Sequence, residues 1–418
     1  MASIRRVVVT GLGALTPLGN TVPAYWDGLR TGTSGAAVIT RFDAAKFKTR
    51  FACEVKGYVA DDFFDRKEHR KMDLFTQFAV VCSDEAIADA GLLTAGVDRD
   101  RVGVIWGSGI GGLKTFHEEA VQFARGDGTP RYNPFFIPKM IADSASGNIS
   151  IKNKFRGPNF ITTSACASSN DAIFAAFNTI RLGMADAVVT GGSEAAITEP
   201  GIGGFNALRA MSERNDAPET ASRPYDRDRD GFVLGEGAGA LVLEEYEHAK
   251  ARGAKIYAEL IGGGMSSDAY HITAPDPSGG GVTLMMRNAL RDAGIGPEAV
   301  DYINTHGTST PLGDGAELKA IEEVFGEHAL RLSISSTKSM TGHLLGGAGG
   351  VEAVACLLAM RHGLVPPTIN FHTPDPEINA ALNLTPNTAQ PRDVQVAMSN
   401  TFGFGGHNTA VIFRKLAS

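Results

Sequence analysis

One cysteine and two histidines stand out because each lies in a short stretch of small and polar residues. Cys166 is preceded by Ile-Thr-Thr-Ser-Ala and followed by Ala-Ser-Ser, between a strand-like run and a helix-like run. His306 lies in Asn-Thr-His-Gly-Thr-Ser-Thr (residues 304–310), and His343 ends Lys-Ser-Met-Thr-Gly-His (residues 338–343). A thiol from one part of the chain and imidazoles from another is the arrangement of covalent thiol catalysis.

The setting of Cys166 favours a reactive thiol over a buried filler. A helix is predicted to begin beside it, and the free N–H groups and dipole of a helix N-terminus favour the thiolate. The same N–H groups can stabilise an oxyanion when a thioester is attacked. Cys53, Cys82 and Cys356 have no such setting and are interpreted as structural thiols. A zinc site made of Cys166 and the two histidines is chemically possible, but no ligand spacing supports it.

Two charged residues are placed to support these loops. Lys338 comes five residues before His343, where its charge could tune or orient the site. Glu352 opens the helix that follows and could pair with the lysine.

A glycine-rich motif suggests a dinucleotide site that the rest of the sequence does not support. Gly-Ser-Gly-Ile-Gly-Gly at residues 107–112 follows a strand-like run and matches G-x-G-x-x-G. No second strand ending in an acidic residue follows at the expected distance, so we interpret the motif as structural.

The elements that must position these residues alternate between strand and helix, which indicates an α/β fold. Predicted strands cover residues 6–9, 102–106, 187–189, 240–243, 300–303, 332–335 and 410–413. Predicted helices cover residues 74–90, 167–182, 283–293, 316–324 and 351–361. At 418 residues the chain is too long for one ordinary core. We predict two α/β halves, residues 1–254 with the cysteine and residues 255–418 with both histidines.

Composition narrows the class of protein. The net charge of −7 argues against general nucleic-acid binding. The four cysteines form no CxxC pair, no signal-peptide pattern precedes the first strand, and no apolar run is long enough to span a membrane. These features favour a cytoplasmic protein with free thiols. One helical face, formed by Arg66, Lys67, Arg70 and Lys71, is basic within this acidic chain and could dock an acidic partner.

Several long motifs, in order and spread from end to end, resemble the β-ketoacyl-[acyl-carrier-protein] synthase II family of condensing enzymes. They are Val-Val-Val-Thr-Gly-Leu-Gly (7–13), Arg-Pro-Tyr-Asp (223–226), Asp-Gly-Phe-Val-Leu-Gly-Glu-Gly (230–237), the two histidine motifs, and Asn-Thr-Phe-Gly-Phe-Gly-Gly (400–406). The resemblance implies the thiolase-like fold, with two similar α/β halves in α-β-α-β-α layers. It also implies a homodimer that acts on acyl and malonyl thioesters of an acyl carrier protein in fatty acid elongation.

The resemblance assigns roles to the candidate residues. Cys166 would accept the acyl group, His306 and His343 would complete a Cys-His-His triad, and Lys338 and Glu352 would support it. Phe402 would gate the malonyl side, and its backbone N–H would form the oxyanion hole with that of Cys166. Substrate would be bound by Thr308 and Thr310 at the phosphopantetheine arm, by Ile110 and Phe205 in the acyl channel, and by Phe404. Arg131 and Arg209 would extend the basic docking face.

The chemistry agrees with these roles. A thiolate is the natural nucleophile for a thioester, and two neutral imidazoles can donate hydrogen bonds to the enolate oxygen formed as CO2 leaves. We expect no metal and no cofactor, since phosphopantetheine arrives on the carrier protein.

The sequence bears on four other functions. A thiolase would need a second cysteine near the C-terminus, where this chain has none. A polyketide ketosynthase shares the triad and remains the alternative, although the free-standing length favours fatty acid synthesis. A chain-length-factor-like subunit would lack the nucleophile, and a binding scaffold would leave the histidine loops unexplained.

The chain departs from the family pattern at two positions. Asp171 stands where Gly-x-His often follows the nucleophile motif, and His407 replaces threonine in Gly-Gly-Thr-Asn. These departures bear on chain-length preference and gating.

Overall fold

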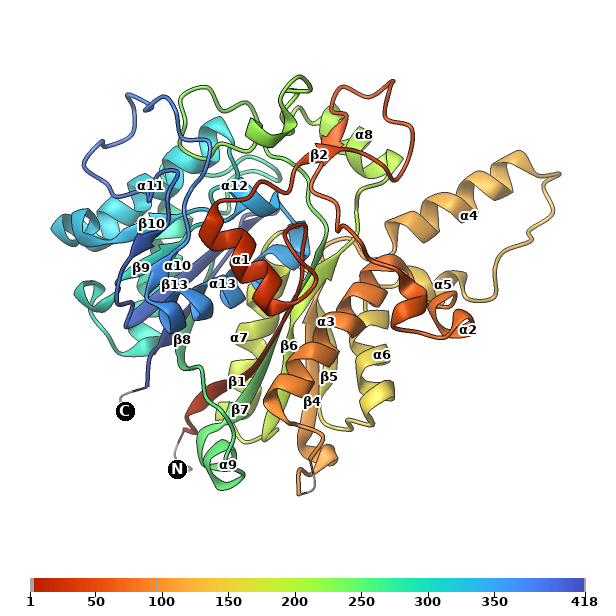
Figure 1. Cartoon of the computed structure of the whole chain (residues 1–418), viewed down its shortest axis with the longest axis horizontal. Helices are drawn as coiled ribbons and strands as arrows, with labels where there is room; N and C mark the ends of the chain where they lie inside the picture. Colours follow the sequence, from red (N-terminus) through yellow and green to blue (C-terminus); the bar gives the residue numbers. More distant parts are fainter. Residues whose placement is uncertain (1–3, 95, 417–418) are drawn as a thin grey trace.

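The computed structural model describes residues 4–94 and 96–416 and is built on one long mixed sheet (Figure 1). The strands of this sheet lie in the order β10-β9-β13-β14-β8-β1-β7-β6-β4-β5. All strands are β1 (Val7–Leu15), β2 (Ala37–Val38), β3 (Phe51–Ala52), β4 (Val102–Gly107), β5 (Asn159–Thr162), β6 (Ala187–Glu194), β7 (Gly237–Glu245), β8 (Ala258–Ser267), β9 (Tyr302–Asn304), β10 (Ser333–Ser335), β11 (Leu364–Val365), β12 (Gln390–Pro391), β13 (Val396–Gly403) and β14 (His407–Arg414).

The helices cover both faces of this sheet. They are α1 (Val22–Thr31), α2 (Arg66–His69), α3 (Leu74–Ala90), α4 (Leu113–Arg125), α5 (Phe136–Met140), α6 (Ser144–Asn153), α7 (Ser168–Arg181), α8 (Glu199–Ala207), α9 (Tyr246–Ala251), α10 (Gly280–Ala293), α11 (Pro311–Phe325), α12 (Lys338–Thr341) and α13 (Ala348–His362). Every strand and helix predicted from the sequence is present, with ends that differ by a few residues.

The strand order repeats within the sheet, so the fold consists of two similar halves. Across the sheet, the first half has the order β5-β4-β6-β7-β1, which are its third, second, fourth, fifth and first strands of this sheet along the chain. The second half has the same order, β10-β9-β13-β14-β8. The halves join where β1 and β8 pair antiparallel over three residues, Val7 to Val9. The predicted division at residues 254 and 255 falls between α9 and β8.

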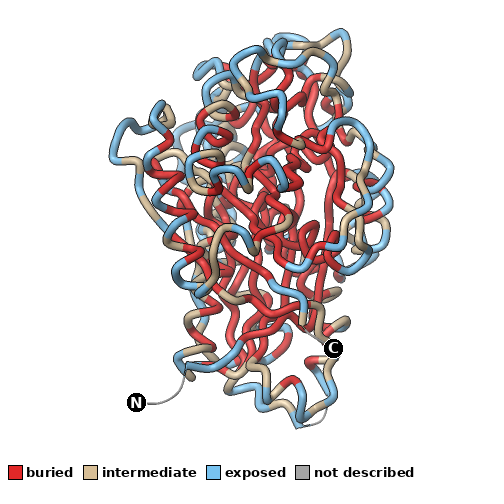
Figure 2. Tube along the Cα trace, turned by 90° about the vertical axis from the view of Figure 1, so that its left-hand side faces the viewer, coloured by how far each residue is buried: buried red, intermediate tan, exposed pale blue. Residues whose placement is uncertain are grey.

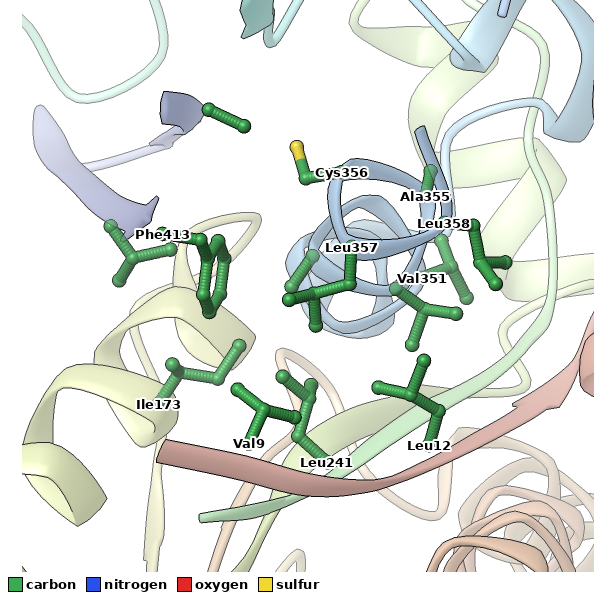
Figure 3. Close-up of a cluster of buried hydrophobic side chains, with 14 of the residues drawn as sticks. Val9, Leu12, Ile173, Leu241, Val351, Ala355, Cys356, Leu357, Leu358 and Phe413 are labelled. Carbon is green, nitrogen blue, oxygen red and sulfur yellow. The ribbon is translucent and has the colours of Figure 1, made fainter. Parts of the chain in front are cut away.

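The two halves fold around a shared middle layer. Helices α7 and α13 contact each other and strands of both halves, while α3 and α6 cover the outer face of the first half and α10 and α11 that of the second. The interior is almost entirely buried and exposure is confined to the periphery (Figure 2). Figure 3 shows how apolar side chains of α13 pack between the halves: Val351 lies towards Leu12 of β1, while Leu357 lies towards Phe413 of β14.

This layering places the predicted chemistry in one region. Cys166 precedes α7, the first half's middle helix, while His343 lies between α12 and α13, the second half's middle helix. His306 follows β9, and the β13–β14 hairpin brings residues 403–406 to the same end of the sheet. The duplicated fold therefore supplies the nucleophile from one half and both imidazoles from the other.

Candidate active site

One cavity of about 450 Å³ joins most of the predicted residues. Its walls include Cys166, Phe205, Arg209, His306, Thr308, Thr310, His343, Phe402 and Phe404. Residues that lie more than two hundred positions apart in the chain thus face a single space. A site of this kind, concave and mixed in polarity, is where a ligand is expected to bind.

The nucleophile turn is strained and braced. Ala165 has φ +50°, a left-handed conformation that is uncommon for a residue with a side chain. The Ser168 hydroxyl holds the turn from inside, since it accepts from Ser164 N (3.0 Å) and donates to Ala165 O (2.6 Å). Strand β4 also ends against this turn, because a Cβ on Gly107 would lie 2.6 Å from the Ser168 carbonyl group. Cys166 is therefore held at the start of α7, with 8% of its surface exposed.

The Cys166 thiol is subject to opposing effects. Burial raises its pKa to about 12, while the charge of Lys338 and the backbone N–H of Phe404 lower it. The helix N-terminus also favours the thiolate. The sequence suggested the helix N-terminus and the charge of Lys338, and the structure adds burial as a larger opposing effect. Burial thus favours the protonated thiol, which must lose its proton as acyl transfer proceeds.

The two histidine rings meet edge to face, with centroids 5.2 Å apart and planes at 90°. The backbone N–H of Phe402 donates to His306 Nδ1 (3.2 Å), which leaves the ring proton on Nε2. Burial and the charge of Lys338 hold the pKa of both imidazoles well below the usual value. Both rings are consequently neutral at physiological pH, and each can offer one N–H donor.

Buried carboxylates hold the loops that carry the histidines. Glu317, on α11, accepts the backbone N–H groups of His306 and Gly307 at 2.9 Å each. Burial raises the pKa of Glu317 to about 7, and these N–H groups lower it. Glu317 was not among the predicted site residues, and no local motif marks it.

Lys338 and Glu352 form the predicted pair. Their side chains are 1% exposed and make a direct ion pair. Burial raises the pKa of Glu352 to about 7 even though the lysine lowers it. A buried pair of this kind costs desolvation energy that its own attraction barely offsets, so it is weak evidence for stability. The charge of Lys338 instead lowers the pKa of Cys166 and of both imidazoles.

The expectation for Phe402 needs correction. Its backbone N–H is engaged by His306 Nδ1, so it is not free to form an oxyanion hole with Cys166. The backbone N–H that lowers the pKa of Cys166 belongs to Phe404, two residues further along the hairpin. The hairpin approaches closely because residue 403 is glycine: a Cβ there would lie 2.4 Å from Ser164 O.

The glycine-rich motif at residues 107–112 does bind an anion, but the anion is internal. The Glu194 carboxylate accepts backbone N–H groups from Gly109 (2.8 Å), Ile110 (3.2 Å) and Gly111 (3.3 Å). Gly346 N, from the loop after His343, donates to the same carboxylate at 3.0 Å. A phosphate would need these same N–H donors, and the Glu194 carboxylate already occupies them. The motif is therefore structural, as predicted.

The remaining predicted substrate residues divide into two groups. Thr308 and Thr310 line the cavity with their hydroxyls 3.1 Å apart, and Phe205 packs against Phe232 and Phe404. Ile110 does not line this cavity and is 41% exposed. A channel wall at Ile110 would therefore need a further surface to cover it.

The predicted docking residues come from three segments of the chain. The four basic residues of the 66–71 segment are exposed around α2, beside α5 (Figure 1). Arg209, with φ +54°, is exposed at the wall of the cavity after α8. Arg131 is exposed in the segment between α4 and α5 and lies 3.5 Å from Asp127.

No group of three or more histidine, cysteine or acidic residues in the described chain is arranged as a metal site. The buried oxygens without a hydrogen-bond partner within residues 4–94 and 96–416 include Asn304 Oδ1, Ser399 Oγ and Glu352 Oε2. Asn304 and Ser399 are register partners on β9 and β13, and α13 packs against both strands. Oxygens of this kind suit a hard cation rather than zinc, so these are the residues that could hold one.

In the part of the chain that the structure describes, no helix is long and apolar enough to cross a membrane.

Known proteins give a consistent comparison. Residues 4–249 match the family model of the β-ketoacyl synthase N-terminal domain, and residues 257–372 match that of the C-terminal domain. A 3-oxoacyl-[acyl-carrier-protein] synthase 2 from Synechocystis sp. is 52% identical over 98% of both chains.

Solved structures agree with these matches. A β-ketoacyl synthase from Burkholderia phymatum superposes with a TM-score of 0.92 at 37% identity, covering 99% of this chain and 100% of that one. A type II polyketide ketosynthase, solved in complex with its acyl-carrier protein, superposes with a TM-score of 0.90 at 34% identity and the same coverage.

Proposed function

This chain belongs to the β-ketoacyl synthase family, and we propose that it elongates acyl chains as a 3-oxoacyl-[acyl-carrier-protein] synthase. It takes an acyl group from a carrier thioester and condenses it with malonyl-[acyl-carrier-protein], releasing CO2. The observation that supports this most directly is the meeting of a helix-start thiol and two neutral imidazoles in one cavity. Thioester exchange needs the thiol, and enolate stabilisation needs the imidazoles.

Acyl transfer is the first step. The Cys166 sulfur attacks the thioester carbonyl, its C–S bond forms, the bond to the carrier sulfur breaks, and the carrier thiol leaves with the proton. The negative charge that develops on the carbonyl oxygen needs preorganised donors. The backbone N–H of Phe404 is one candidate, because it lowers the pKa of the Cys166 thiol.

Decarboxylation and condensation follow. The bond between the malonyl carboxylate and its methylene carbon breaks, CO2 leaves, and the electron pair forms an enolate on the thioester. His306 Nε2–H and the ring N–H of His343 donate to the enolate oxygen. The enolate carbon then attacks the acyl group on Cys166, a C–C bond forms, and the sulfur leaves as thiolate and regains a proton. Thr308 and Thr310 are placed to hold the arm of the incoming carrier.

Fatty acid elongation is favoured over polyketide assembly. The relative named 3-oxoacyl-[acyl-carrier-protein] synthase 2 is 52% identical, whereas the polyketide ketosynthase is 34% identical. The experiment that tests the function supplies acyl-carrier and malonyl-carrier thioesters and detects the product by mass spectrometry. The expected product is a 3-oxoacyl-carrier two carbons longer than the acyl donor, with one CO2 per turnover. No condensation with any acyl length would contradict the proposal.

The substrate carrier is proposed to dock through local positive charge. The ketosynthase compared above was solved with an acyl-carrier protein, which supports a partner of this class. The chain carries a net charge of −7, so an acidic carrier is repelled overall and needs a positive target. The exposed α2 segment and Arg209 offer such targets.

Reversing two of these charges is expected to weaken carrier recognition alone. In the Lys67→Glu/Lys71→Glu variant, the KM for carrier-linked acyl substrate should rise about 10-fold or more at low salt, because steering is lost. Turnover of a small pantetheine thioester should stay close to wild type. Steady-state kinetics with both substrates, over a salt series, provide the measurement.

A matched control reverses two exposed lysines at the opposite end of the molecule. Lys250→Glu/Lys415→Glu changes the net charge equally, near α9 and the C-terminus (Figure 1). It should leave the KM for carrier substrate nearly unchanged. Equal effects of the two double variants would mean that net charge, not the α2 segment, controls docking.

A homodimer is also proposed, on the basis of one uncovered edge. Strand β5 ends the sheet, and Phe160 on it is 42% exposed. Nearby, the α4–α5 region exposes large apolar side chains: Phe116, Phe123, Tyr132, Phe135 and Ile137. Exposed sheet edges and clusters of exposed apolar side chains normally have a partner. A second copy would also cover Ile110.

A further inference from the structure

A half-buried carboxylate that none of the steps above uses lies on the helix that begins beside the nucleophile. Asp171 is in the first turn of α7 and accepts a hydrogen bond from the Thr409 hydroxyl of β14. The Ser164 hydroxyl, two residues before Cys166, lies close enough to lower the pKa of Asp171. That hydroxyl is buried and makes no well-formed hydrogen bond within the described residues. Asp171 thus connects the nucleophile turn to the second half of the molecule.

The strand that Asp171 holds belongs to the hairpin that covers the site. Thr409 pairs with Thr401 in the β13–β14 register, two positions from Gly403 and the tip of the hairpin. The neighbouring Asn170 side chain donates to Ser399 O (3.1 Å) and Thr409 O (3.4 Å), which fixes the base of the hairpin. The first turn of α7 therefore anchors the hairpin by two consecutive side chains.

The position of this hairpin matters because it carries two donors of the active site. The Phe402 N–H sets the tautomer of His306, and the Phe404 N–H lowers the pKa of Cys166. A small shift of the hairpin would misdirect the second donor most, since Phe404 lies farther from the anchor. Misplacing one oxyanion donor has a large effect on acyl transfer.

We propose that Asp171 is a positioning residue that, through Thr409, sets the placement of the 403–406 loop over Cys166. The inference rests on the proposed function, because the placement is useful only if Cys166 accepts an acyl group. Asp171 and His407, the two positions where the chain departs from the family pattern, are then connected, since His407 is on the same strand as Thr409.

Charge makes the anchor sensitive to pH. Burial raises the pKa of Asp171, while Ser164, Thr409 and the charge of His407 lower it. Among the charged groups on the described elements around Asp171, His407 of β14 is the one that acts on it. A carboxylate with a raised pKa forms only as pH rises through that value, so the anchor is strongest at higher pH and weakens in acid. Removing His407 should raise the pKa further.

The test is a double-mutant cycle on the acylation half-reaction. Asp171→Ala and Thr409→Val should each lower the rate constant for acylation of Cys166, followed by mass spectrometry, about 10-fold with little change in KM. The double variant should also lose about 10-fold, not about 100-fold, because both changes break one contact. Thr409→Ser keeps the hydroxyl and should retain the wild-type rate. Additive losses, or wild-type rates in both single variants, would overturn the proposal.

Two further variants separate positioning from a general structural role. Asp171→Asn keeps an acceptor oxygen and should restore most of the rate, but it should remove the acid limb of the acylation pH profile. His407→Ala should move that limb to higher pH in the wild-type background and have no such effect in Asp171→Asn. An unchanged acid limb in both variants counts against the proposal. If wild type itself is never acylated, the proposed function fails instead, so the two failures are distinguishable.

Discussion

Cys166→Ala should abolish acyl transfer and condensation, with a loss of about 10⁴-fold or more, because no other group at the site can form the acyl thioester. The other three thiols are buried, and burial raises the pKa of each. None of them lines the cavity that contains Cys166. Mass spectrometry of protein incubated with acyl-carrier substrate should therefore locate the acyl group on Cys166 alone.

The Cys166→Gln variant separates the nucleophile from the rest of the site. Glutamine cannot carry the acyl group, but its amide resembles the acylated cysteine. Condensation should be lost, while release of CO2 from malonyl-carrier should continue, because the imidazoles remain. Cys82→Ala is the matched control for loss of a buried thiol and should keep both activities. An acyl group found on Cys53, Cys82 or Cys356 would exclude Cys166 as the acceptor.

The sequence was sufficient for the parts of the site that depend on local pattern. The nucleophile turn, the loops with His306 and His343, and the Lys338–Glu352 pair were all predicted, and the structure brings them together. Strand and helix positions were predictable because hydrophobic periodicity reports burial directly. The twofold repeat of strand order was expected only through family resemblance, since no short-period repeat marks it.

Other features depend on which distant groups meet, and local pattern does not report that. The chain has 46 acidic residues, and nothing in the sequence singles out Glu194 and Glu317 as the ones that enter the interior. Both do so because loop N–H groups converge on them and partly offset the cost of burial. The roles of Phe402 and Phe404 depend on the register of a hairpin, where a shift of two residues changes which N–H faces the sulfur.

His306→Ala and His343→Ala should each slow malonyl decarboxylation by roughly 10²–10³-fold, because each removes one donor to the enolate oxygen. Acylation of Cys166 should be affected much less, since that step needs an oxyanion donor near the sulfur rather than these imidazoles. Timing the two half-reactions separately gives the measurement. His343→Gln keeps an N–H near the position of the ring donor and should recover part of the loss. Equal losses in both half-reactions would contradict the role in enolate stabilisation.

The pH dependence of decarboxylation distinguishes neutral donors from charged ones. Burial and the charge of Lys338 lower the pKa of both histidines well below the usual value. A histidine with a lowered pKa stays neutral down to that value, so the decarboxylation rate in Cys166→Gln should be flat from about pH 6 to pH 8. An imidazolium donor would instead make the rate fall as pH rises through this range. A flat profile together with the loss in His306→Ala would establish that the proton on Nε2, placed there by the N–H of Phe402, is the one that serves the enolate.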